Sequence, residues 1–156
     1  MTTTLLFVGK TTDPHIEALC QAYLKRLTHY LPLKVVIIPE LRNTKALTPE
    51  QQKQAEGELI LRAVPQSAEF ILLDEHGKEY RSIEFAQQMQ KKMSSGRDIF
   101  FVIGGPYGFS QSVYDRANGK ISLSQMTFSH QMVRLFLIEQ IYRAMTILRG
   151  EPYHHE

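Results

Sequence analysis

The stretch Ile99-Phe100-Phe101-Val102-Ile103 runs directly into Gly104-Gly105-Pro106-Tyr107-Gly108. Five apolar residues without polar alternation are typical of a strand that is buried on both faces, as in a parallel sheet covered by helices. The glycines follow at the carboxyl end of this strand, and that edge is where open α/β sheets bind ligands. We therefore expect a ligand at this loop, although the pentapeptide alone fits a tight turn between a strand and a helix equally well.

Length and composition describe an ordinary globular protein. The 156 residues, 43% of them hydrophobic and 22% charged, predict one domain that covers residues 1–156. The single cysteine, Cys20, excludes an intramolecular disulfide. We recognise no signal peptide and no membrane-spanning segment, and we expect a cytoplasmic protein. The net charge of +2 is compatible with a nucleic-acid partner but too small to argue for one.

Strands and helices alternate along the chain around the opening stretch. Apolar runs predict strands at residues 4–8, 33–38, 70–73, 99–103 and 120–124, with a turn at His76-Gly77. Capping residues and helical periodicity predict helices that start at Asp13, Thr48, Ser82, Ser110 and about Ser129. This order predicts an α/β fold: a mainly parallel sheet of five to six strands with helices on both faces.

The last predicted helix, from about Ser129 to Arg149, is apolar around more of its circumference than a surface helix needs. Its apolar residues are Met132, Leu135, Phe136, Leu137, Ile138, Ile141, Tyr142, Met145, Ile147 and Leu148. A domain of this size has little room for a central helix, so we expect one side to pack on the sheet and the other to meet a second copy of the chain. The pattern predicts a homodimer.

Several common ligand motifs are absent from the sequence. Gly9-Lys10-Thr11 lacks the upstream glycine of a phosphate-binding P-loop, and the glycines of a dinucleotide fingerprint would follow the first strand rather than the fourth. The histidines are scattered apart from the adjacent His154-His155, so we expect no metal site. Neither ATP nor NAD is favoured.

Three loops should meet at the carboxyl edge of the predicted sheet, after Leu73, Ile103 and Ser124. They offer glycine, backbone and apolar side chains, which suits an adenine-sized ligand held by main-chain hydrogen bonds. The nearest cation is Arg134, one helical turn after His130 and on the same face. His130 taken alone also fits a packed or solvent-facing start of a helix.

Four segments carry a resemblance to a known family: residues 103–108, 123–132, 139–144 and the tail Pro152-Tyr153-His154. Together they resemble the small single-domain SPOUT methyltransferases that modify large-subunit ribosomal RNA. The resemblance implies a SPOUT α/β-knot fold with a trefoil knot at the carboxyl end, a homodimer, and S-adenosylmethionine bound among the knotted loops. The cofactor-binding residues it implies are Leu73, Gly104, Gly105, Leu123, Ser124, Gln125, Met126, Thr127 and Phe128.

The reaction implied by the resemblance is methyl transfer to N3 of a pseudouridine in 23S rRNA of the assembled ribosome. N3 is an imide nitrogen that must lose its proton, and His130 or the partner subunit's His154 could accept that proton. Arg134 could hold a phosphate or stabilise the developing anion, and Tyr153 could stack on the base. The chain has no separate RNA-binding domain and no overt basic patch, so we expect poor affinity for naked RNA.

Two other functions fit the same residues. One is a knotted methyltransferase that acts on transfer RNA, for instance at a ribose 2′-hydroxyl. The other is a non-catalytic, dimeric ribosome-binding factor that has kept the ligand pocket.

Overall fold

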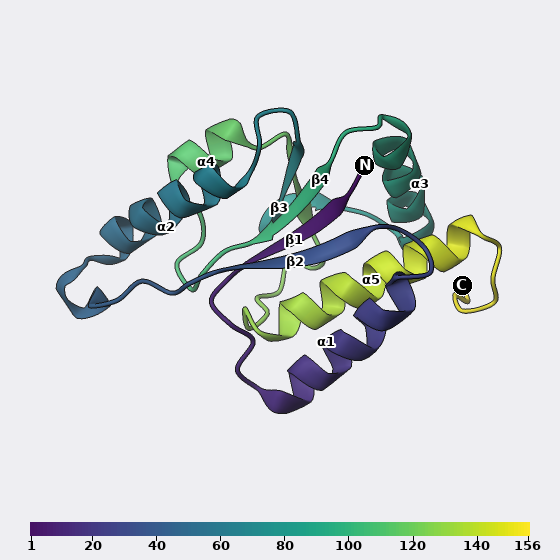
Figure 1. Cartoon of the computed structure of the whole chain (residues 1–156), viewed down its shortest axis with the longest axis horizontal. Helices are drawn as coiled ribbons and strands as arrows, with labels where there is room; N and C mark the ends of the chain where they lie inside the picture. The colour runs from purple at the N-terminus through teal and green to yellow at the C-terminus, as the bar shows by residue number, and fades with distance from the viewer.

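The computed structural model describes residues 1–156 as one five-stranded sheet between two layers of helices (Figure 1). The strands are β1 (Thr3–Val8), β2 (Leu33–Ile38), β3 (Glu69–Glu79), β4 (Ile99–Ile103) and β5 (Gly119–Ser122). Their order in the sheet is β2-β1-β4-β3-β5, and every neighbouring pair is parallel. The predicted α/β class and the parallel sheet are confirmed, with β4 as the central strand of the sheet. The trefoil knot stays a prediction.

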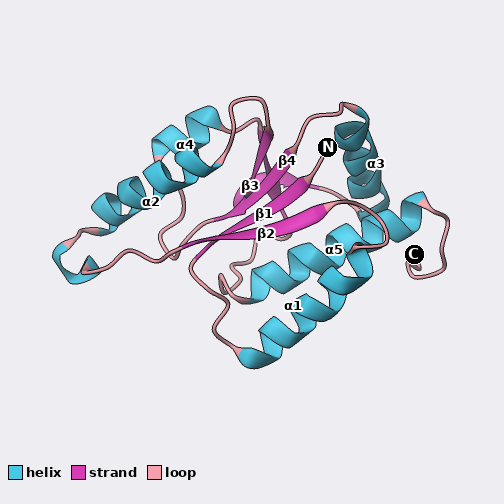
Figure 2. Cartoon of the chain, in the orientation of Figure 1, coloured by secondary structure: helices cyan, strands magenta, loops and turns pink.

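Helices cover both faces of the sheet, as predicted. They are α1 (Pro14–Leu27), α2 (Pro49–Ala63), α3 (Ser82–Ser94), α4 (Gln111–Arg116) and α5 (Met132–Leu148), with a short 3₁₀ helix η1 (Thr44–Ala46). Figure 2 shows α1, α3 and α5 on one side of the strands and α2 and α4 on the other. None of the helices is long and apolar enough to cross a membrane.

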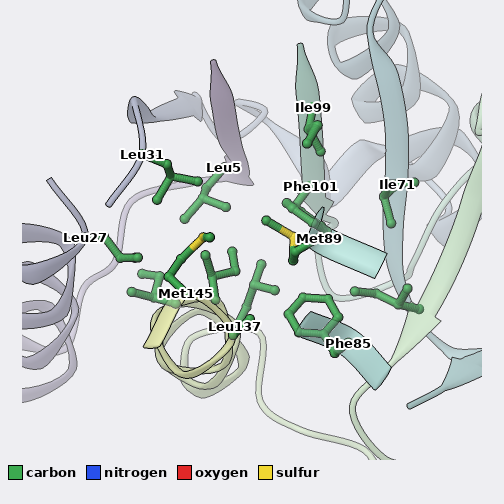
Figure 3. Packing of buried hydrophobic residues seen from close by; sticks show 14 of the residues in the cluster. Leu5, Leu27, Leu31, Ile71, Phe85, Met89, Ile99, Phe101, Leu137 and Met145 are labelled. Atoms are coloured by element: carbon green, nitrogen blue, oxygen red, sulfur yellow. The ribbon is translucent and has the colours of Figure 1, made fainter. Parts of the chain in front are cut away.

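The side chains of the central strands alternate between two apolar clusters. In β1, Leu5 and Phe7 belong to an 18-residue cluster with α1, α3 and α5, whereas Leu6 and Val8 belong to a 12-residue cluster with α2 and α4. This alternation follows from the two-residue period of a strand and explains why residues 5–8 of β1 and all of β4 are apolar on both faces. Figure 3 shows Leu137 and Met145 of α5 packed in the larger cluster with side chains from α3 and the sheet.

Local signals in the sequence set the ends of most helices. The Asp13 carboxylate accepts hydrogen bonds from His15 N and Ile16 N, and Thr48 and Gln51 form a reciprocal capping box at the start of α2. After α5, Gly150 has a φ of 68°, the left-handed conformation expected of a glycine beyond a helix end. Cys20 is 3% exposed in the core, as its position on the apolar face of α1 predicted.

The predicted turn at His76-Gly77 is wrong, because β3 continues through these residues to Glu79. Its register against β5 shifts between Leu73 and Lys78, so the extra residues form an irregularity within the strand pair. A Cβ on Gly77 would lie 2.7 Å from backbone atoms of Ile121. The glycine therefore allows two backbones to approach closely, which a sequence pattern cannot distinguish from a turn.

The capping residue of α3 and the first residue of α5 differ from the prediction. The residue before α3 is Arg81 rather than Ser82, because the Glu84 carboxylate accepts a hydrogen bond from Arg81 N at 2.9 Å. Helix α5 begins at Met132 rather than near Ser129, and Ser129 Oγ accepts a hydrogen bond from Met132 N at 3.0 Å. Residues 129–131 consequently belong to the loop that leads into α5, which places His130 outside the helix.

Candidate functional site

A cleft of about 550 Å³ lies at the carboxyl edge of the sheet, between the second half of β3 and the loops after β4 and β5. Residues from all three segments that the sequence predicted to meet, after Leu73, Ile103 and Ser124, line this cleft, although the first of them is part of β3 and not a loop. The lining residues are Leu73, Asp74, Glu75 and His76 on β3; Ile103 to Phe109 from the end of β4; Ser122 to Ser124 and Met126 to His130 from the end of β5; and Lys53, Tyr114 and Val133 on the helices. Apart from Lys53, all of them lie between Leu73 and Val133 in the sequence.

The glycine loop after β4 is a tight turn and also a wall of the cleft. Gly108 N donates a hydrogen bond to Gly105 O at 3.2 Å, and Gly108 has a φ of 80°. A Cβ on Gly104 would lie 2.9 Å from the ring of Phe109, which folds back under the loop. The need for glycine at position 104 therefore arises from packing inside the chain, not only from the approach of a ligand as the sequence argument supposed.

The loop after β5 is held by short-range hydrogen bonds and by one bond to the neighbouring loop. Ser122 Oγ donates to Ser124 O at 2.8 Å, and Ser124 Oγ accepts from Met126 N at 3.0 Å. Thr127 Oγ1 donates to Glu75 Oε2 at 3.1 Å, which joins the loop after β5 to the second half of β3. The cleft therefore has an ordered wall that presents backbone atoms at its rim.

Asp74 and Glu75 give the cleft an acidic side that the sequence argument missed. Asp74 Oδ1 accepts from His76 N at 2.8 Å, and Asp74 Oδ2 accepts from the Tyr114 hydroxyl. Burial, together with this hydrogen bond to Asp74, raises the pKa of Tyr114 above its usual range, so the hydroxyl stays a donor. The signal in the sequence was the position of Asp74 directly after Leu73, at the ligand-binding end of a parallel strand.

Most of the predicted cofactor-binding residues line this cleft. Those that do are Leu73, Gly104, Gly105, Leu123, Ser124, Met126, Thr127 and Phe128, and His130 lines it as well. Gln125, between two lining residues, does not. Met126 is 78% exposed, and the ring of Phe128 lies 5.2 Å from that of Phe136 on α5.

Arg134 does not face the cleft, although the sequence predicted a phosphate or an anion as its partner. Its side chain is 0% exposed, and its guanidinium donates to three backbone carbonyls: Val8 O at 2.8 Å, Gly9 O at 2.9 Å and His130 O at 3.0 Å. Nη1 also donates to Thr11 Oγ1 at 3.0 Å, and the Phe7 ring lies 4.9 Å away. Each of its three nitrogens thus donates within its own chain, and the buried side chain cannot reach a phosphate as the sequence predicted.

The surroundings of Arg134 explain why this buried cation is tolerated. Burial lowers the pKa of the guanidinium, whereas the charges of Cys20, Glu40 and Glu17 oppose that shift. Carbonyl oxygens that would otherwise lie unpaired at the end of β1 receive charge-assisted hydrogen bonds from it. Nearby, Gln131 Nε2 donates to Lys10 O at 3.1 Å. Arg134 and Gln131 together attach the segment before α5, including His130, to the loop after β1.

Tyr153 and His154 lie away from the cleft of their own chain. The tail folds back on α5, where the Tyr153 hydroxyl donates to Glu139 Oε1 at 2.9 Å and lies 3.3 Å from the Tyr23 hydroxyl. Burial, followed by these two hydrogen bonds, raises the pKa of Tyr153 above its usual range. Figure 1 shows the chain end beyond the carboxyl end of α5, opposite the end that reaches the cleft.

His154 is engaged with Arg143 in this arrangement. Arg143 Nη1 lies 3.1 Å from His154 Nδ1, and a guanidinium can only donate, so Nδ1 is the acceptor and the ring proton is on Nε2. Arg143 Nη2 also donates to Glu139 Oε1 at 2.6 Å. The lone pair that would accept a substrate proton is therefore occupied while the tail is folded on its own helix.

The comparisons with known proteins agree with this architecture. Residues 1–154 match a family model described as "Predicted SPOUT methyltransferase". A structure of a probable methylase family protein from Haemophilus influenzae Rd KW20 aligns over 99% of this chain and 70% of that chain, with a TM-score of 0.55 and 9% identity, which supports the fold alone.

Curated relatives match over nearly their whole length. A protein from Bacteroides fragilis is 57% identical over 100% of both chains, and one from Flavobacterium johnsoniae is 54% identical over 97% of this chain and 98% of its own. Both are named ribosomal RNA large subunit methyltransferase H. With a parallel sheet, a cleft at its carboxyl edge and a family match that covers almost all its residues, the chain belongs to the SPOUT methyltransferase family.

Proposed function

We propose that this chain is an S-adenosylmethionine-dependent methyltransferase that methylates N3 of a pseudouridine in 23S rRNA of the assembled ribosome. The observation that carries the proposal is the cleft itself, which brings the three separately predicted loops into one site. The relatives named ribosomal RNA large subunit methyltransferase H, more than half identical along the chain, support ribosomal RNA as the substrate.

The composition of the cleft suits S-adenosylmethionine as the methyl donor. Its volume of about 550 Å³ lies in the range of small-molecule sites. Backbone groups of Gly104 and of the loop from Leu123 to Phe128 offer hydrogen bonds to an adenine edge, and Leu73 and Ile103 offer apolar surface. Asp74 and Glu75 place negative charge beside a ligand that carries cationic groups. When bound, this cofactor supplies an electrophilic methyl group on a sulfonium.

His130 is the group of this chain best placed to accept the N3 proton. It lines the cleft in the loop before α5, and its carbonyl is fixed by Arg134 Nε at 3.0 Å. We therefore reassign Arg134 from a substrate contact to a positioning residue for His130. An imidazole ring offers a nitrogen lone pair that can accept a proton, as a general base for an imide nitrogen requires.

The second candidate base, the partner subunit's His154, requires a homodimer. In its own chain His154 contacts Arg143, which lies ten residues beyond the cleft residue Val133, or about 15 Å along α5. A second copy would have to bring its tail to this cleft, with Tyr153 available to stack on the base. The chain itself offers no extended basic surface at its net charge of +2, which favours recognition on the assembled ribosome over naked RNA.

Single-turnover methyl transfer to ribosomes tests the two histidines. His130→Ala should slow transfer by about a hundredfold or more, because a positioned general base contributes roughly 10²–10⁴ in rate. His154→Ala mixed with His130→Ala should regain activity in heterodimers if the partner subunit's His154 completes the cleft. The exposed His29→Ala is the control. Rates within a few fold of wild type for both variants would contradict a histidine base.

The alternative functions give different results with labelled cofactor. Ribosomes, separated subunits, naked 23S rRNA and transfer RNA, all from a strain that lacks the gene, are incubated with the protein and methyl-labelled S-adenosylmethionine. We expect label in ribosomes and little in naked rRNA or transfer RNA. Label in transfer RNA would favour the other methyltransferase, and binding of ribosomes without label in any RNA would favour the non-catalytic factor.

A further inference from the structure

Helix α2 contacts both ends of the glycine loop through two neighbouring buried residues, Glu56 and Gly57. A Cβ on Gly105 would lie 2.6 Å from Glu56 Oε1, and a Cβ on Gly57 would lie 2.4 Å from Ser110 Oγ. Ser110 in turn caps α4, where its Oγ accepts a hydrogen bond from Val113 N at 3.4 Å. The segment from Gly105 to Ser110 therefore packs directly against α2, and neither contact leaves space for an added Cβ.

The Glu56 carboxyl is buried with an incomplete set of hydrogen bonds. The residue is 4% exposed, and Gln52 Nε2 donates to its Oε2 at 3.1 Å. Oε1, the oxygen nearest to Gly105, has no hydrogen-bond partner. An ionised carboxylate is costly in such a place, whereas an apolar side chain of similar length would fill the same space at no such cost. Packing alone therefore does not explain an acid at this position.

The surroundings of Glu56 favour its neutral form. Burial raises the pKa of the carboxyl, and the charge of Glu40, after β2, raises it further. The hydrogen bond from Gln52 and the charge of His130, before α5, act in the opposite direction. Because burial is the largest of these effects, the carboxyl stays protonated above the usual range of a glutamate.

We propose that Glu56 is a positioning residue for cofactor binding, which supports Gly105 and so holds the Gly104–Gly108 loop in the shape that lines the cleft. The proposal rests on the proposed function, since it assumes that the cleft binds S-adenosylmethionine. Glu56 itself does not line the cleft and acts through the loop.

The pH dependence of cofactor binding follows from the protonation of Glu56. At low pH the neutral carboxyl stays against Gly105. As the pH rises through the raised pKa of Glu56, the carboxylate ionises and becomes more stable in water than in its buried position. Its movement toward water removes the support of Gly105 and loosens the loop. The affinity for S-adenosylmethionine therefore falls. Glu56→Gln replaces the ionisable carboxyl by a neutral amide and keeps the shape of the side chain. His130, which lines the cleft, is the same residue in both proteins.

Calorimetry with S-adenosylmethionine across this pH range tests the inference in the full-length protein. We expect Glu56→Gln to lose the fall in affinity that wild type shows at rising pH. The matched control is Glu58→Gln, which removes the same charge from an exposed position on the same helix and should keep the wild-type profile. Superimposable profiles of wild type and Glu56→Gln would overturn the proposal.

A double substitution tests the contact itself. Gly105 does not have a positive φ, and the three atoms nearest to an added Cβ all belong to Glu56, so this carboxyl is the obstacle to alanine. We expect Gly105→Ala to weaken cofactor binding about tenfold, the equivalent of one lost hydrogen bond. In a Glu56→Ala background, Gly105→Ala should weaken cofactor binding by much less than tenfold. If the fold-loss of affinity in the double variant equals the product of the fold-losses in the two single variants, the two residues act independently.

Hydrogen exchange decides the positioning role without any ligand. Amides of residues 104–110 should exchange faster in Glu56→Ala than in wild type, and Glu58→Ala should leave them unchanged. Equal exchange in Glu56→Ala and wild type would overturn the inference even if the cofactor binds. A different outcome is that wild type binds no S-adenosylmethionine, while residues 104–110 still exchange faster in Glu56→Ala than in wild type. That outcome would overturn the proposed function alone.

Discussion

Arg134 joins three segments that meet beneath the cleft. Its guanidinium donates to the end of β1 at Val8, to the following loop at Gly9 and to the loop before α5 at His130. Because the hydrogen bonds to Val8 O and Gly9 O are buried, the cation satisfies carbonyls that lie inside the protein, and its bond to His130 O fixes the backbone at His130. One side chain therefore links the stability of the sheet edge to the geometry of the proposed catalytic site.

Substitution of Arg134 should be strongly destabilising. We expect Arg134→Met to lower the free energy of unfolding by about 3 kcal/mol or more, because each charge-assisted hydrogen bond contributes roughly 1.5–3 kcal/mol. Urea denaturation followed by circular dichroism measures this change. Arg42→Met, at an exposed position, is the control and should cost little. A loss below about 1 kcal/mol for Arg134→Met would show that the carbonyls find other donors.

The sequence could place Arg134 close to His130 but could not identify its partners. Two of those partners, the carbonyls of Val8 and Gly9, lie more than a hundred positions away, and a carbonyl carries no signature in the sequence. The same limit applies to Gly104, whose need for glycine comes from the ring of Phe109. Leu73 and Gly105 could be placed at the cleft because strand ends and glycines do leave a pattern.

At the level of elements, α2 matters because it supports the wall of the cleft and is short of apolar residues. Only Glu56, Gly57 and Ile60 are buried along its length. Its start is correspondingly well marked, since Gln51 N donates to Thr48 Oγ1 at 3.1 Å and Thr48 N donates to Gln51 Oε1 at 2.9 Å. This reciprocal pair stabilises a helix that has little packing energy of its own.

Loss of the cap should therefore be measurable. Thr48→Ala should cost about 1 kcal/mol, or roughly 2–4 °C in melting temperature for a domain of this size. Thr48→Ser keeps the hydroxyl and should stay within a few tenths of a kcal/mol of wild type. Thermal unfolding by calorimetry compares the three proteins. Equal melting temperatures of Thr48→Ala and Thr48→Ser would contradict a stabilising role for the hydroxyl.

Elements with strong local signals could be predicted closely, and those defined by pairing could not. The capped helices and the continuous strand Ile99–Ile103 were predicted almost to the residue. Strand β3 was predicted too short because its second half pairs with β5 across a register shift, where Gly77 looks like a turn residue. The order of the strands in the sheet depends on contacts between distant segments. The alternation of strands and helices along the chain therefore predicted a parallel sheet but not the order of its strands.

At the scale of the whole molecule, α5 leaves part of its apolar surface uncovered. Its core side is fully buried at Leu137, Ile138 and Ile141, whereas Met132 is 38% exposed and Phe136 39% exposed. Phe136 also contacts Phe128 of the cleft loop through its ring. A second copy that covered this surface would therefore lie next to the proposed cofactor site, as the predicted homodimer requires.

Sedimentation at micromolar concentration tests the homodimer. Wild type should sediment at twice the mass of the 18.0 kDa chain, and Phe136→Glu should shift the protein to single chains because it places a charge in the apolar contact. Ile83→Glu is matched in exposure at 39% but lies on α3, and it should remain dimeric. A single 18.0 kDa species for wild type would contradict the dimer and, with it, a role for the partner subunit's His154.

The most direct test of the central claim is to map the methyl group on the RNA product. Ribosomes from a strain that lacks the gene are incubated with the protein and labelled S-adenosylmethionine, and nuclease fragments of the rRNA are analysed by mass spectrometry. We expect one labelled methyl group at N3 of a pseudouridine in 23S rRNA, and we expect this label to be lost with His130→Ala. Label on another base, on a ribose or in transfer RNA would contradict it.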